Sequence, residues 1–497
     1  MAAFVGVDLG TGGARALVVD GAGRRLGAHA VEYPLSAPRP GFAEQDPLEW
    51  RRAAALSVRG AVERARIAPA DVLAVGLTGQ MHSAVFLDGR GAPLRPAILW
   101  CDGRTARECD ELTERAGGTE ALLAATLNVA LPGFTAPKLL WLRRNEPELA
   151  ARVRTLLVGK DWLRLCWTGE RATDVAEASG TLLFDVARRR WSEPLLRALD
   201  VDPAILPRAV ESTAVTGALS AAAARELGLA AGTPVVAGAG DQAASAVGSG
   251  VTRPGAWSIS LGTSGVVFAA CERPLVDPDG ALHSFCHAVP DTWHAMGVML
   301  SAGGAVSWFR RMVSGGGELV PFATLDAEAA AAPPGSGGLL FLPYLAGERT
   351  PIRDPHARGA FLGLSTAHGR GHAMRAVLEG VALGLRACGA LLESRGLVAS
   401  EVRLTGGGAR SRLFAQIVAD ALGRELVLLE QEEGPAHGAA LLAAAGVTPG
   451  ATVPALAAAW VQIRGRVEPE ADSATLLAGI AARHRAHYEA LRPLGPA

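Results

Sequence analysis

The chain has 497 residues, of which 49% are hydrophobic and 20% charged, and its formal net charge is −1. This length exceeds what one hydrophobic core supports, so we expect two or three domains. The hydrophobic content excludes a largely disordered chain. The balanced charge, with no basic stripe, argues against a nucleic-acid partner.

The cysteines and one uncharged stretch indicate where in the cell the protein is expected. The six cysteines form no Cys-x-x-Cys pair, which favours reduced thiols. The sequence opens on a strand and has no signal-peptide layout, so we predict a cytoplasmic protein. Residues 434–463 lack Asp, Glu, Lys and Arg, but Pro449, Gly450 and Pro454 interrupt them. The stretch is rich in alanine rather than leucine, so we predict no membrane span.

The first candidate ligand loop lies near residue 10. An apolar strand at residues 4–7 leads into Asp8-Leu9-Gly10-Thr11-Gly12-Gly13, and a second strand is predicted at residues 15–19. Glycines let the backbone approach a ligand closely, and free N–H groups beside a hydroxyl suit a phosphate. The pattern therefore predicts a phosphate-binding loop between two strands.

Polar side chains follow the next strands. A helix is predicted at residues 47–66, and a buried strand at 72–77 runs into Thr78-Gly79-Gln80-Met81-His82. A strand at 84–87 and the segment 98–104, with Trp100 and Asp102, come next. In α/β folds, side chains just past strand ends contact ligands. Singly, His82 also fits a half-buried structural histidine and Asp102 a helix cap. Residues 128–210 are expected to elaborate this core.

A second glycine-rich stretch, residues 235–266, carries a carboxylate. A strand at 235–237 leads through Gly238-Ala239-Gly240 to Asp241 and a small-residue helix at 242–248. A strand at 257–261 then precedes Gly262-Thr263-Ser264-Gly265. Asp241 could be a helix N-cap, part of a dinucleotide-binding fingerprint, or a base beside a phosphate loop. The fingerprint needs an acidic residue about 20 positions later, and the corresponding strand has none.

The two loops share the pattern Leu-Gly-Thr-x-Gly and lie about half the chain apart. A strand–turn–strand unit that recurs at the start of each half predicts two similar α/β domains facing each other. We place the division between residues 1–247 and 248–497.

The second half repeats these features. Strands are predicted within 259–270, at 339–342 and at 402–405, and helices at 372–393 and 413–422. His283-Ser284-Phe285-Cys286-His287 lacks further ligands at zinc-site spacing, so we do not expect zinc there. Gly406-Gly407-Gly408 precedes the helix predicted at 413–422. It is either a plain tight turn or a site where a nucleotide meets bare backbone, and the two phosphate loops favour the nucleotide.

These parts suit phosphoryl transfer. No Walker A motif is present, because the one Gly-Lys pair, at 159–160, is followed by Asp161. Phosphoryl transfer needs only backbone cradles, Mg²⁺ and a base for the acceptor hydroxyl. Asp241 is the candidate base.

The loops at 8–11, 260–265 and 405–410 resemble those of the FGGY carbohydrate kinases. Residues 133–142 match that family's first signature, and residues 359–379 match its second except at Ala373. The resemblance implies two ribonuclease-H-like domains of the actin/hexokinase/Hsp70-like ATPase class, with a central cleft. It also implies that ATP and Mg²⁺ are used to phosphorylate a sugar, and a homodimer is a possibility by analogy.

Residues 79–82, 132–138, 283–287 and 347–351 resemble the family members that phosphorylate D-xylulose to D-xylulose 5-phosphate. Two departures are Gly12, where Ser or Thr is common, and Gln242, where some members carry Asn. The alternatives are a kinase of another ketose or polyol, such as ribulose or L-xylulose, and a non-catalytic ATP-dependent sugar sensor. Retention of Asp241 argues against the sensor.

The resemblance also assigns site residues. Asp241 would be the general base that takes the proton from the C5 hydroxyl, and Asp8 would hold Mg²⁺ largely through water. The sugar pocket would be formed by Met81, His82, Trp100, Asp102 and Asp241. The ATP-binding residues would be Gly10, Thr11, Gly12, Arg15, Gly262 and Thr263 at the phosphate, with Gly406, Gly407 and Gly408 at the adenine and ribose.

Overall fold

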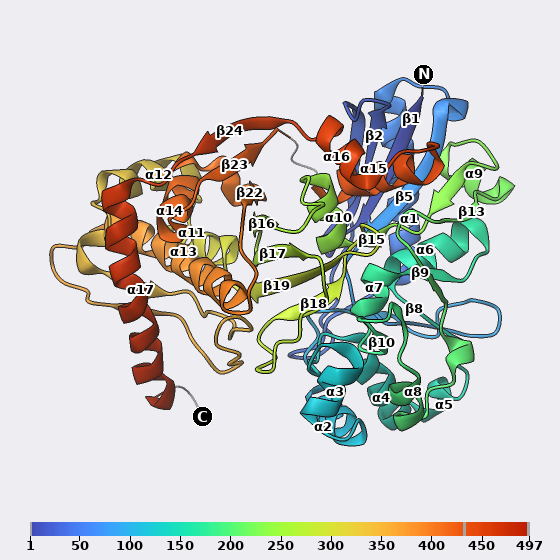
Figure 1. Cartoon of the computed structure of the whole chain (residues 1–497), viewed down its shortest axis with the longest axis horizontal. Helices are drawn as coiled ribbons and strands as arrows, with labels where there is room; N and C mark the ends of the chain where they lie inside the picture. The colour runs from blue at the N-terminus through green and yellow to red at the C-terminus, as the bar shows by residue number, and fades with distance from the viewer. Residues whose placement is uncertain (1, 431–433, 495–497) are drawn as a thin grey trace.

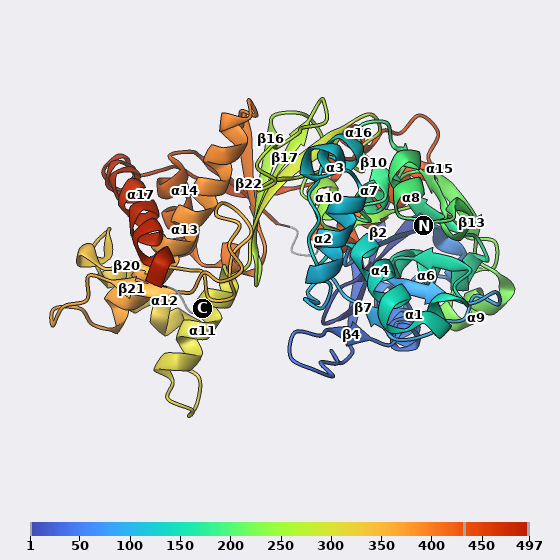
Figure 2. The same ribbon diagram turned by 90° about the horizontal axis from the view of Figure 1, so that it is seen from below.

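The structure is a computed structural model that describes residues 2–430 and 434–494. It consists of two lobes, each built on a seven-stranded sheet (Figure 1). Seen from below, the two lobes lie side by side, and β16 and β17 of the second lobe face the first lobe (Figure 2). The predicted two-domain α/β fold is confirmed.

The first sheet has the strand order β13-β14-β5-β1-β2-β3, with β15 paired to β5. β1, β2 and β3 form an antiparallel meander, whereas β5 and β14 run parallel to β1. The strands are β1 (Ala3–Leu9), β2 (Gly13–Asp20), β3 (Arg25–Glu32), β5 (Val72–Gly79), β13 (Val215–Ala218), β14 (Pro234–Val236) and β15 (Ala239–Gly240). β1 is an almost fully buried apolar run, as expected for a strand covered on both faces.

The second sheet repeats this plan. Its order is β18-β19-β17-β16-β22-β23-β24, in which β16, β17 and β19 are antiparallel while β22 and β23 run parallel to β16. The strands are β16 (Ala256–Leu261), β17 (Gly265–Cys271), β18 (His283–Cys286), β19 (Trp293–Met299), β22 (Glu401–Thr405), β23 (Leu426–Leu429) and β24 (Ile463–Val467). β16 therefore occupies the place that β1 has in the first sheet. The two predicted phosphate loops are the turns of equivalent hairpins.

Helices flank the sheets close to the predicted bounds. The helix predicted at 47–66 is α1 (Pro47–Ala65), and that predicted at 372–393 is α13 (Arg370–Ser394). The helix predicted at 413–422 is α14 (Arg412–Leu422). Other helices of the two lobes are α6 (Gly159–Thr168), α9 (Ala221–Leu227), α10 (Asp241–Gly248), α11 (Gly303–Val313), α12 (Phe322–Ala331) and α17 (Ala471–Leu491).

The chain returns to the first lobe near its end. Helices α15 (Gly434–Val447) and α16 (Val453–Trp460) lie beside β1 and β2 in Figure 1. Glycines in the strands allow α15 to lie directly against the sheet, because a Cβ at Gly6 would lie 1.9 Å from the Ala436 carbonyl oxygen. A Cβ at Gly76 would lie as close to that of Ala439. The uncharged stretch is thus a buried helical layer. No helix in the described ranges has both the length and the apolar character needed to cross a bilayer.

Residues 128–210 form the predicted elaboration of the first lobe. Its helices lie below the first sheet in Figure 1. The helices of this layer and the segment before it are α2 (Ala106–Arg115), α3 (Thr119–Thr126), α4 (Thr135–Asn145), α5 (Pro147–Ala150), α7 (Val175–Ser179) and α8 (Glu193–Ala198). Short two-stranded pairings join β4 (Glu44–Gln45) to β7 (Ala97–Ile98), β6 (Val85–Leu87) to β8 (Thr155–Leu157), β9 (Ala172–Asp174) to β12 (Arg208–Val210), β10 (Phe184–Asp185) to β11 (Arg190–Trp191), and β20 (Leu340–Leu342) to β21 (Ala360–Leu362). All six cysteines are free thiols.

Candidate active site

The first loop is the tight turn between β1 and β2. The Gly10 N–H donates to the Gly13 carbonyl at 3.0 Å, and the Tyr33 hydroxyl donates to the Gly10 carbonyl. The Gln45 amide fixes the next residue by donating to the Thr11 carbonyl at 2.7 Å. A Cβ on Gly12 would have no neighbour within 4 Å, so this backbone is open to an incoming group. The loop has the rigidity and openness that a phosphate cradle requires.

A hydrogen-bonded chain anchors the Thr11 side chain. The Trp100 indole N–H donates to Thr11 Oγ1 at 2.9 Å, and Thr11 Oγ1 donates to Gln80 Oε1 at 3.2 Å. The Gln80 amide in turn donates to Gln45 Oε1 at 2.9 Å. Trp100 and Thr11 are therefore held in fixed positions by groups from three different loops.

The second loop follows β16 and lies against the start of α11. The Gly303 N–H donates to the Gly262 carbonyl at 2.8 Å, and the Gly304 N–H to the Thr263 carbonyl at 3.0 Å. A Cβ at Gly303 would lie 2.5 Å from the Gly262 carbonyl oxygen, so a glycine is needed for this contact. Hydrogen bonds to the carbonyl groups of the loop therefore hold it in place.

The triple glycine at the end of β22 divides into two roles. Gly406 has φ +86°, and a Cβ there would lie 2.8 Å from the Leu261 backbone, so this glycine joins the turn to β16. A Cβ on Gly407 would have no neighbour within 4 Å. Gly407 therefore leaves open backbone beside the second loop, as a nucleotide site would need.

Asp241 is the first residue of α10, and the N-cap of that helix is Gly240. The N-cap interpretation of Asp241 is therefore wrong. Burial, and next the charge of nearby Asp8, raise the pKa of Asp241 to about 7. A carboxylate with such a pKa is half ionised at neutral pH and can accept a proton from a hydroxyl.

Asp8 lies at the end of β1, opposite Arg15 on β2. Burial raises the pKa of Asp8 to about 6, and the Arg15 charge opposes that shift. Asp8 Oδ1 is buried and has no hydrogen-bond partner among the described residues. The lobe thus presents two nearby carboxyl groups, one with an unsatisfied oxygen. The exposed Arg15 lies beside them at the edge of the loop.

A cavity of about 140 Å³ lies between the two lobes and brings these elements together. Of the predicted site residues, Thr11, Met81, His82, Trp100 and Asp241 line it. The remaining lining residues are Gln242, Ser264, Val266, His283, Met296, Val298 and Arg349, most of them from the second lobe.

His82 enters the cavity with a fixed tautomer. Its backbone has φ +68°, and Lys138 Nζ donates to its carbonyl oxygen at 2.8 Å. His82 Nδ1 lies 2.5 Å from the Gly180 carbonyl oxygen, and burial holds the pKa of the imidazole well below its usual range. The ring is therefore neutral, Nδ1 carries the hydrogen, and Nε2 is left as an acceptor. A Cβ at Gly180 would lie 2.7 Å from the His82 ring, so this approach requires glycine.

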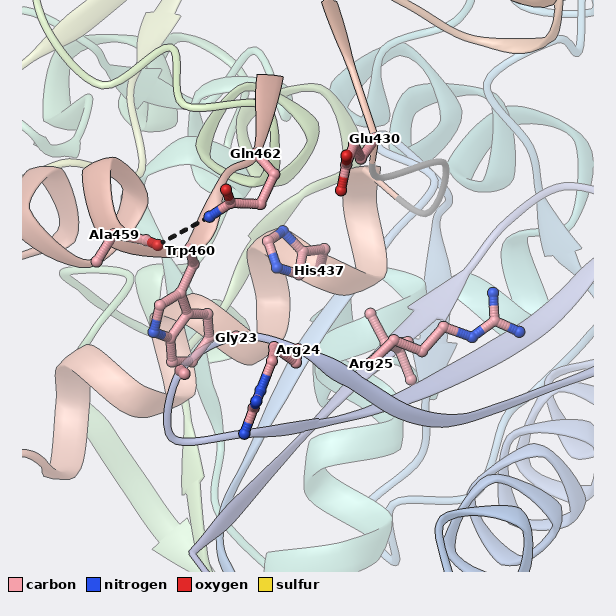
Figure 3. A pocket seen from close by; sticks show the side chains of 10 residues that line it. Gly23, Arg24, Arg25, Glu430, His437, Ala459, Trp460 and Gln462 are labelled. Carbon is pink, nitrogen blue, oxygen red and sulfur yellow. Dashed lines mark hydrogen bonds between the residues drawn. The ribbon is translucent and has the colours of Figure 1, made fainter. Parts of the chain in front are cut away.

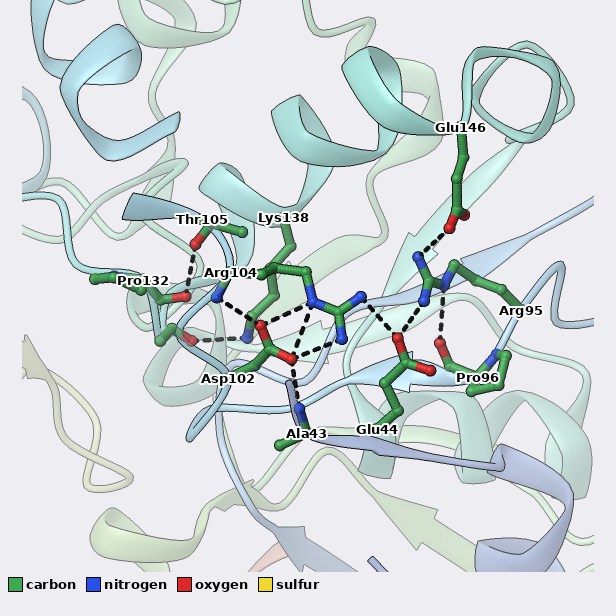
Figure 4. Close-up of polar contacts among 11 residues, drawn as sticks. Ala43, Glu44, Arg95, Pro96, Asp102, Arg104, Thr105, Pro132, Lys138 and Glu146 are labelled. Atoms are coloured by element: carbon green, nitrogen blue, oxygen red, sulfur yellow. Dashed lines mark hydrogen bonds and ion pairs between the residues drawn. The ribbon is translucent and has the colours of Figure 1, made fainter. Parts of the chain in front are cut away.

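Asp102 departs from its predicted role, because it does not line the cavity. Its carboxylate is fully buried and binds the Arg104 guanidinium, with a shortest contact of 2.7 Å (Figure 4). Its Oδ2 also accepts from the Ala43 N–H at 2.6 Å. With both oxygens engaged, Asp102 fixes the loop that carries Trp100 instead of facing a sugar. Arg104 itself stacks on Phe42 and pairs with Glu44.

The comparisons with known proteins agree with this geometry. Residues 3–248 match the N-terminal domain of the FGGY family of carbohydrate kinases, and residues 257–447 match its C-terminal domain. The chain belongs to this family. It is 42% identical to the xylulose kinase of Escherichia coli (strain K12), over 90% of each chain. A crystal structure of a xylulose kinase from Rhodospirillum rubrum has a TM-score of 0.90 at 33% identity and covers 99% of both chains. A structure titled as a xyloylose kinase from Brucella ovis has a TM-score of 0.91 at 40% identity, covering 99% of this chain and 100% of that one.

This FGGY kinase also has cavity residues that the sequence patterns did not assign. His283 and Arg349 lie in motifs, 283–287 and 347–351, that were noted only for the resemblance or as a rejected metal site. Ser264 is part of the second loop itself. No group of three or more His, Cys, Asp or Glu in the described ranges is arranged to hold a metal ion.

A buried ionic cluster lies behind the cavity. Lys160 Nζ pairs with Asp161 at 2.7 Å and with Asp174 at 2.6 Å, and Arg164 pairs with Asp161 at 2.6 Å. Arg164 also donates to the Ala237 carbonyl, just upstream of the turn to Asp241. Asp174 caps α7, and the Gly180 carbonyl that accepts from His82 directly follows this helix. The cluster thus supports the turn that leads to Asp241 and the segment whose Gly180 carbonyl holds His82.

A larger cavity of about 660 Å³ lies outside this site. It is bounded by the β2–β3 turn, including Gly23 and Arg24, and by Trp460 and Gln462 near β24 (Figure 3). None of the predicted site residues lines it. Its size alone assigns it no role in the kinase reaction.

Proposed function

We propose that this kinase transfers the γ-phosphoryl group of ATP to the C5 hydroxyl of D-xylulose. The observation that carries the proposal is the position of Asp241, a half-buried carboxyl with a pKa of about 7 that lines the cavity between the lobes. The similarity to xylulose kinases over 90% of the chain supports the choice of sugar.

In the proposed reaction, Asp241 accepts the C5 hydroxyl proton while that oxygen attacks the γ-phosphorus. His82 accepts a hydrogen bond at Nε2 from another sugar hydroxyl, since its Nδ1–H is committed to Gly180. Met81 and Trp100 form apolar walls, and the indole N–H keeps Trp100 fixed on Thr11. The loops at Gly10–Gly12 and Gly262–Thr263 supply backbone and hydroxyl groups for the phosphates.

The residues present fit a magnesium ion. Asp8 offers a buried carboxylate oxygen without a partner in the described residues, and one such oxygen suits an ion that keeps most of its water. Mg²⁺ bound with ATP would neutralise charge on the β- and γ-phosphates. Asp8 would hold it, and Arg15 opposite keeps the Asp8 carboxyl more ionised.

The test is ADP release by the purified protein with D-xylulose, L-xylulose, D-ribulose, L-ribulose, glycerol and gluconate. We expect the highest kcat/KM with D-xylulose. A higher kcat/KM with another ketose or polyol would overturn the assignment of D-xylulose as the substrate. ADP release that no sugar stimulates would favour the sugar sensor.

A further inference from the structure

The guanidinium of Arg349 lines the cavity and makes no hydrogen bond or ion pair with any described residue. Its backbone is engaged, since its N–H donates to Glu348 Oε1 at 2.8 Å and its carbonyl accepts from the Arg353 N–H at 2.7 Å. Its Cζ lies 6.0 Å from the centre of the Trp100 ring, which belongs to the opposite lobe. A charge withdrawn from water normally has a counter-ion or several hydrogen bonds, and this half-buried guanidinium has neither among the described residues, so a ligand can supply acceptors for it.

The neighbouring carboxyl does not supply them. Glu348 Oε1 is occupied by the N–H groups of Leu300 and Arg349, both at 2.8 Å. Burial raises the pKa of Glu348 to about 8, so the group is mostly neutral at pH 7. The positive charge of Arg349 therefore faces the cavity largely uncompensated.

The polar side chains that line the cavity include Asp241 and a second group, His82, His283 and Arg349. The members of this group lie close together. Phe134 packs between the two histidines, at 4.9 Å from the His82 ring and 5.8 Å from the His283 ring. Burial first, and then the Arg349 charge, lower the pKa of His283 to about 3, and the same charge acts on His82. With the C5 hydroxyl of the sugar assigned to Asp241, this second group remains for the C1–C2 end.

We propose that Arg349 binds the hydroxyketone end of the sugar, donating two N–H groups to the C1 hydroxyl oxygen and the C2 carbonyl oxygen. The guanidinium is a planar fork of donors that suits two adjacent oxygens, such as the C1 hydroxyl and the C2 carbonyl of a ketose. This inference rests on the proposed phosphorylation at C5. Because Arg349 belongs to the second lobe and Trp100 and His82 to the first, the bound sugar also ties the lobes together.

The experiment compares D-xylulose with 1-deoxy-D-xylulose, which lacks the C1 hydroxyl. In the wild type, loss of one acceptor for a charged donor is expected to lower kcat/KM by about tenfold or more. In Arg349→Met, kcat/KM for D-xylulose falls, the preference between the two sugars shrinks toward one, and the KM for ATP changes little. Arg349→Lys keeps the charge without the fork and is expected to recover part of the preference.

The matched control is Arg353→Met. Arg353 is an exposed arginine of the same loop, its guanidinium donates to the Asp279 carbonyl, and it does not line the cavity. It is expected to keep the wild-type preference. An equal kcat/KM for both sugars in the wild type, or an unchanged preference in Arg349→Met, overturns the inference, and the wild-type comparison needs no folded variant. If the wild type phosphorylates a different ketopentose, the proposed substrate is wrong. Arg349 is then tested with that sugar and its 1-deoxy form.

Discussion

Replacement of Asp241 by asparagine is the most direct test of the site. The side chain keeps its shape at the first position of α10 but can no longer accept the C5 proton. Loss of a general base typically lowers the rate by a factor on the order of 10²–10⁴. The kcat of the variant with D-xylulose is therefore expected to be lower than that of the wild type by a factor in this range. The KM for ATP is expected to change little, because ATP is proposed to bind the glycine-rich loops and not this carboxylate.

The pH dependence of kcat/KM provides a second, independent test of the base. Only the ionised carboxylate accepts a proton, and burial places the pKa of Asp241 at about 7. Wild-type kcat/KM should therefore rise with pH through 7 and be about tenfold lower at pH 6 than at pH 8. Below pH 6 the fall should steepen, because Asp8, with a pKa of about 6, also loses its charge. In Asp241→Asn, the rise of kcat/KM with pH near pH 7 should disappear.

Both readings come from a coupled ADP-release assay on protein checked by circular dichroism. Asp472→Asn is the matched control, since Asp472 is an exposed aspartate in the first turn of α17, far from the cavity. It should retain wild-type kinetics. Near-normal kcat in Asp241→Asn, or a wild-type profile that is flat from pH 6 to 8, would refute the assignment of the base.

The other predictions follow from neighbouring parts of the site. His82→Ala should raise the KM for D-xylulose with little change in the KM for ATP, whereas equal effects on both would indicate a structural histidine. Lys160→Met leaves Asp161 and Asp174 buried without their cation and should lower the free energy of unfolding by about 3–5 kcal/mol, measured by urea denaturation. The exposed pair of Arg197 and Glu193 provides the control, and Arg197→Met should be nearly neutral. Small-angle scattering should show a smaller radius of gyration with D-xylulose and a non-hydrolysable ATP analogue, and ATP hydrolysis without sugar should be slow. An unchanged radius would contradict closure of the lobes.

Local patterns predicted much of this fold because each was tied to a short-range rule. The Leu-Gly-Thr-x-Gly repeat marked two hairpins that prove to be equivalent in the two sheets. Apolar runs and helical periodicity placed α1, α13 and β5 within a few residues. Residues directly past strand ends, such as Met81, His82 and Asp241, were found because that position is shared by many α/β sites.

The errors arose where two distant segments decide a residue's environment. Asp102 was expected in the sugar pocket, but the N–H of Ala43, which is distant in the sequence, and the guanidinium of nearby Arg104 occupy its carboxylate. The return of α15 to the first sheet depends on how close its backbone can come to Gly6 and Gly76, which hydrophobic patterning does not encode. Arg349 was overlooked as a site residue because only the meeting of the lobes brings it beside Trp100.

The same glycine contacts indicate which part of the site moves. α10, which begins at Asp241, packs against α15 so closely that a Cβ at Gly438 would lie 1.8 Å from the Ala244 carbonyl oxygen. α15 is itself in backbone contact with β1, which carries Asp8, and with β5, which ends at Gly79. Asp241, Asp8 and the loop at Gly10–Gly12 therefore form one rigid unit. In the proposed lobe closure, Gly262, Thr263, Gly407 and Arg349 move toward this unit, so we expect the nucleotide and the far end of the sugar to be positioned last.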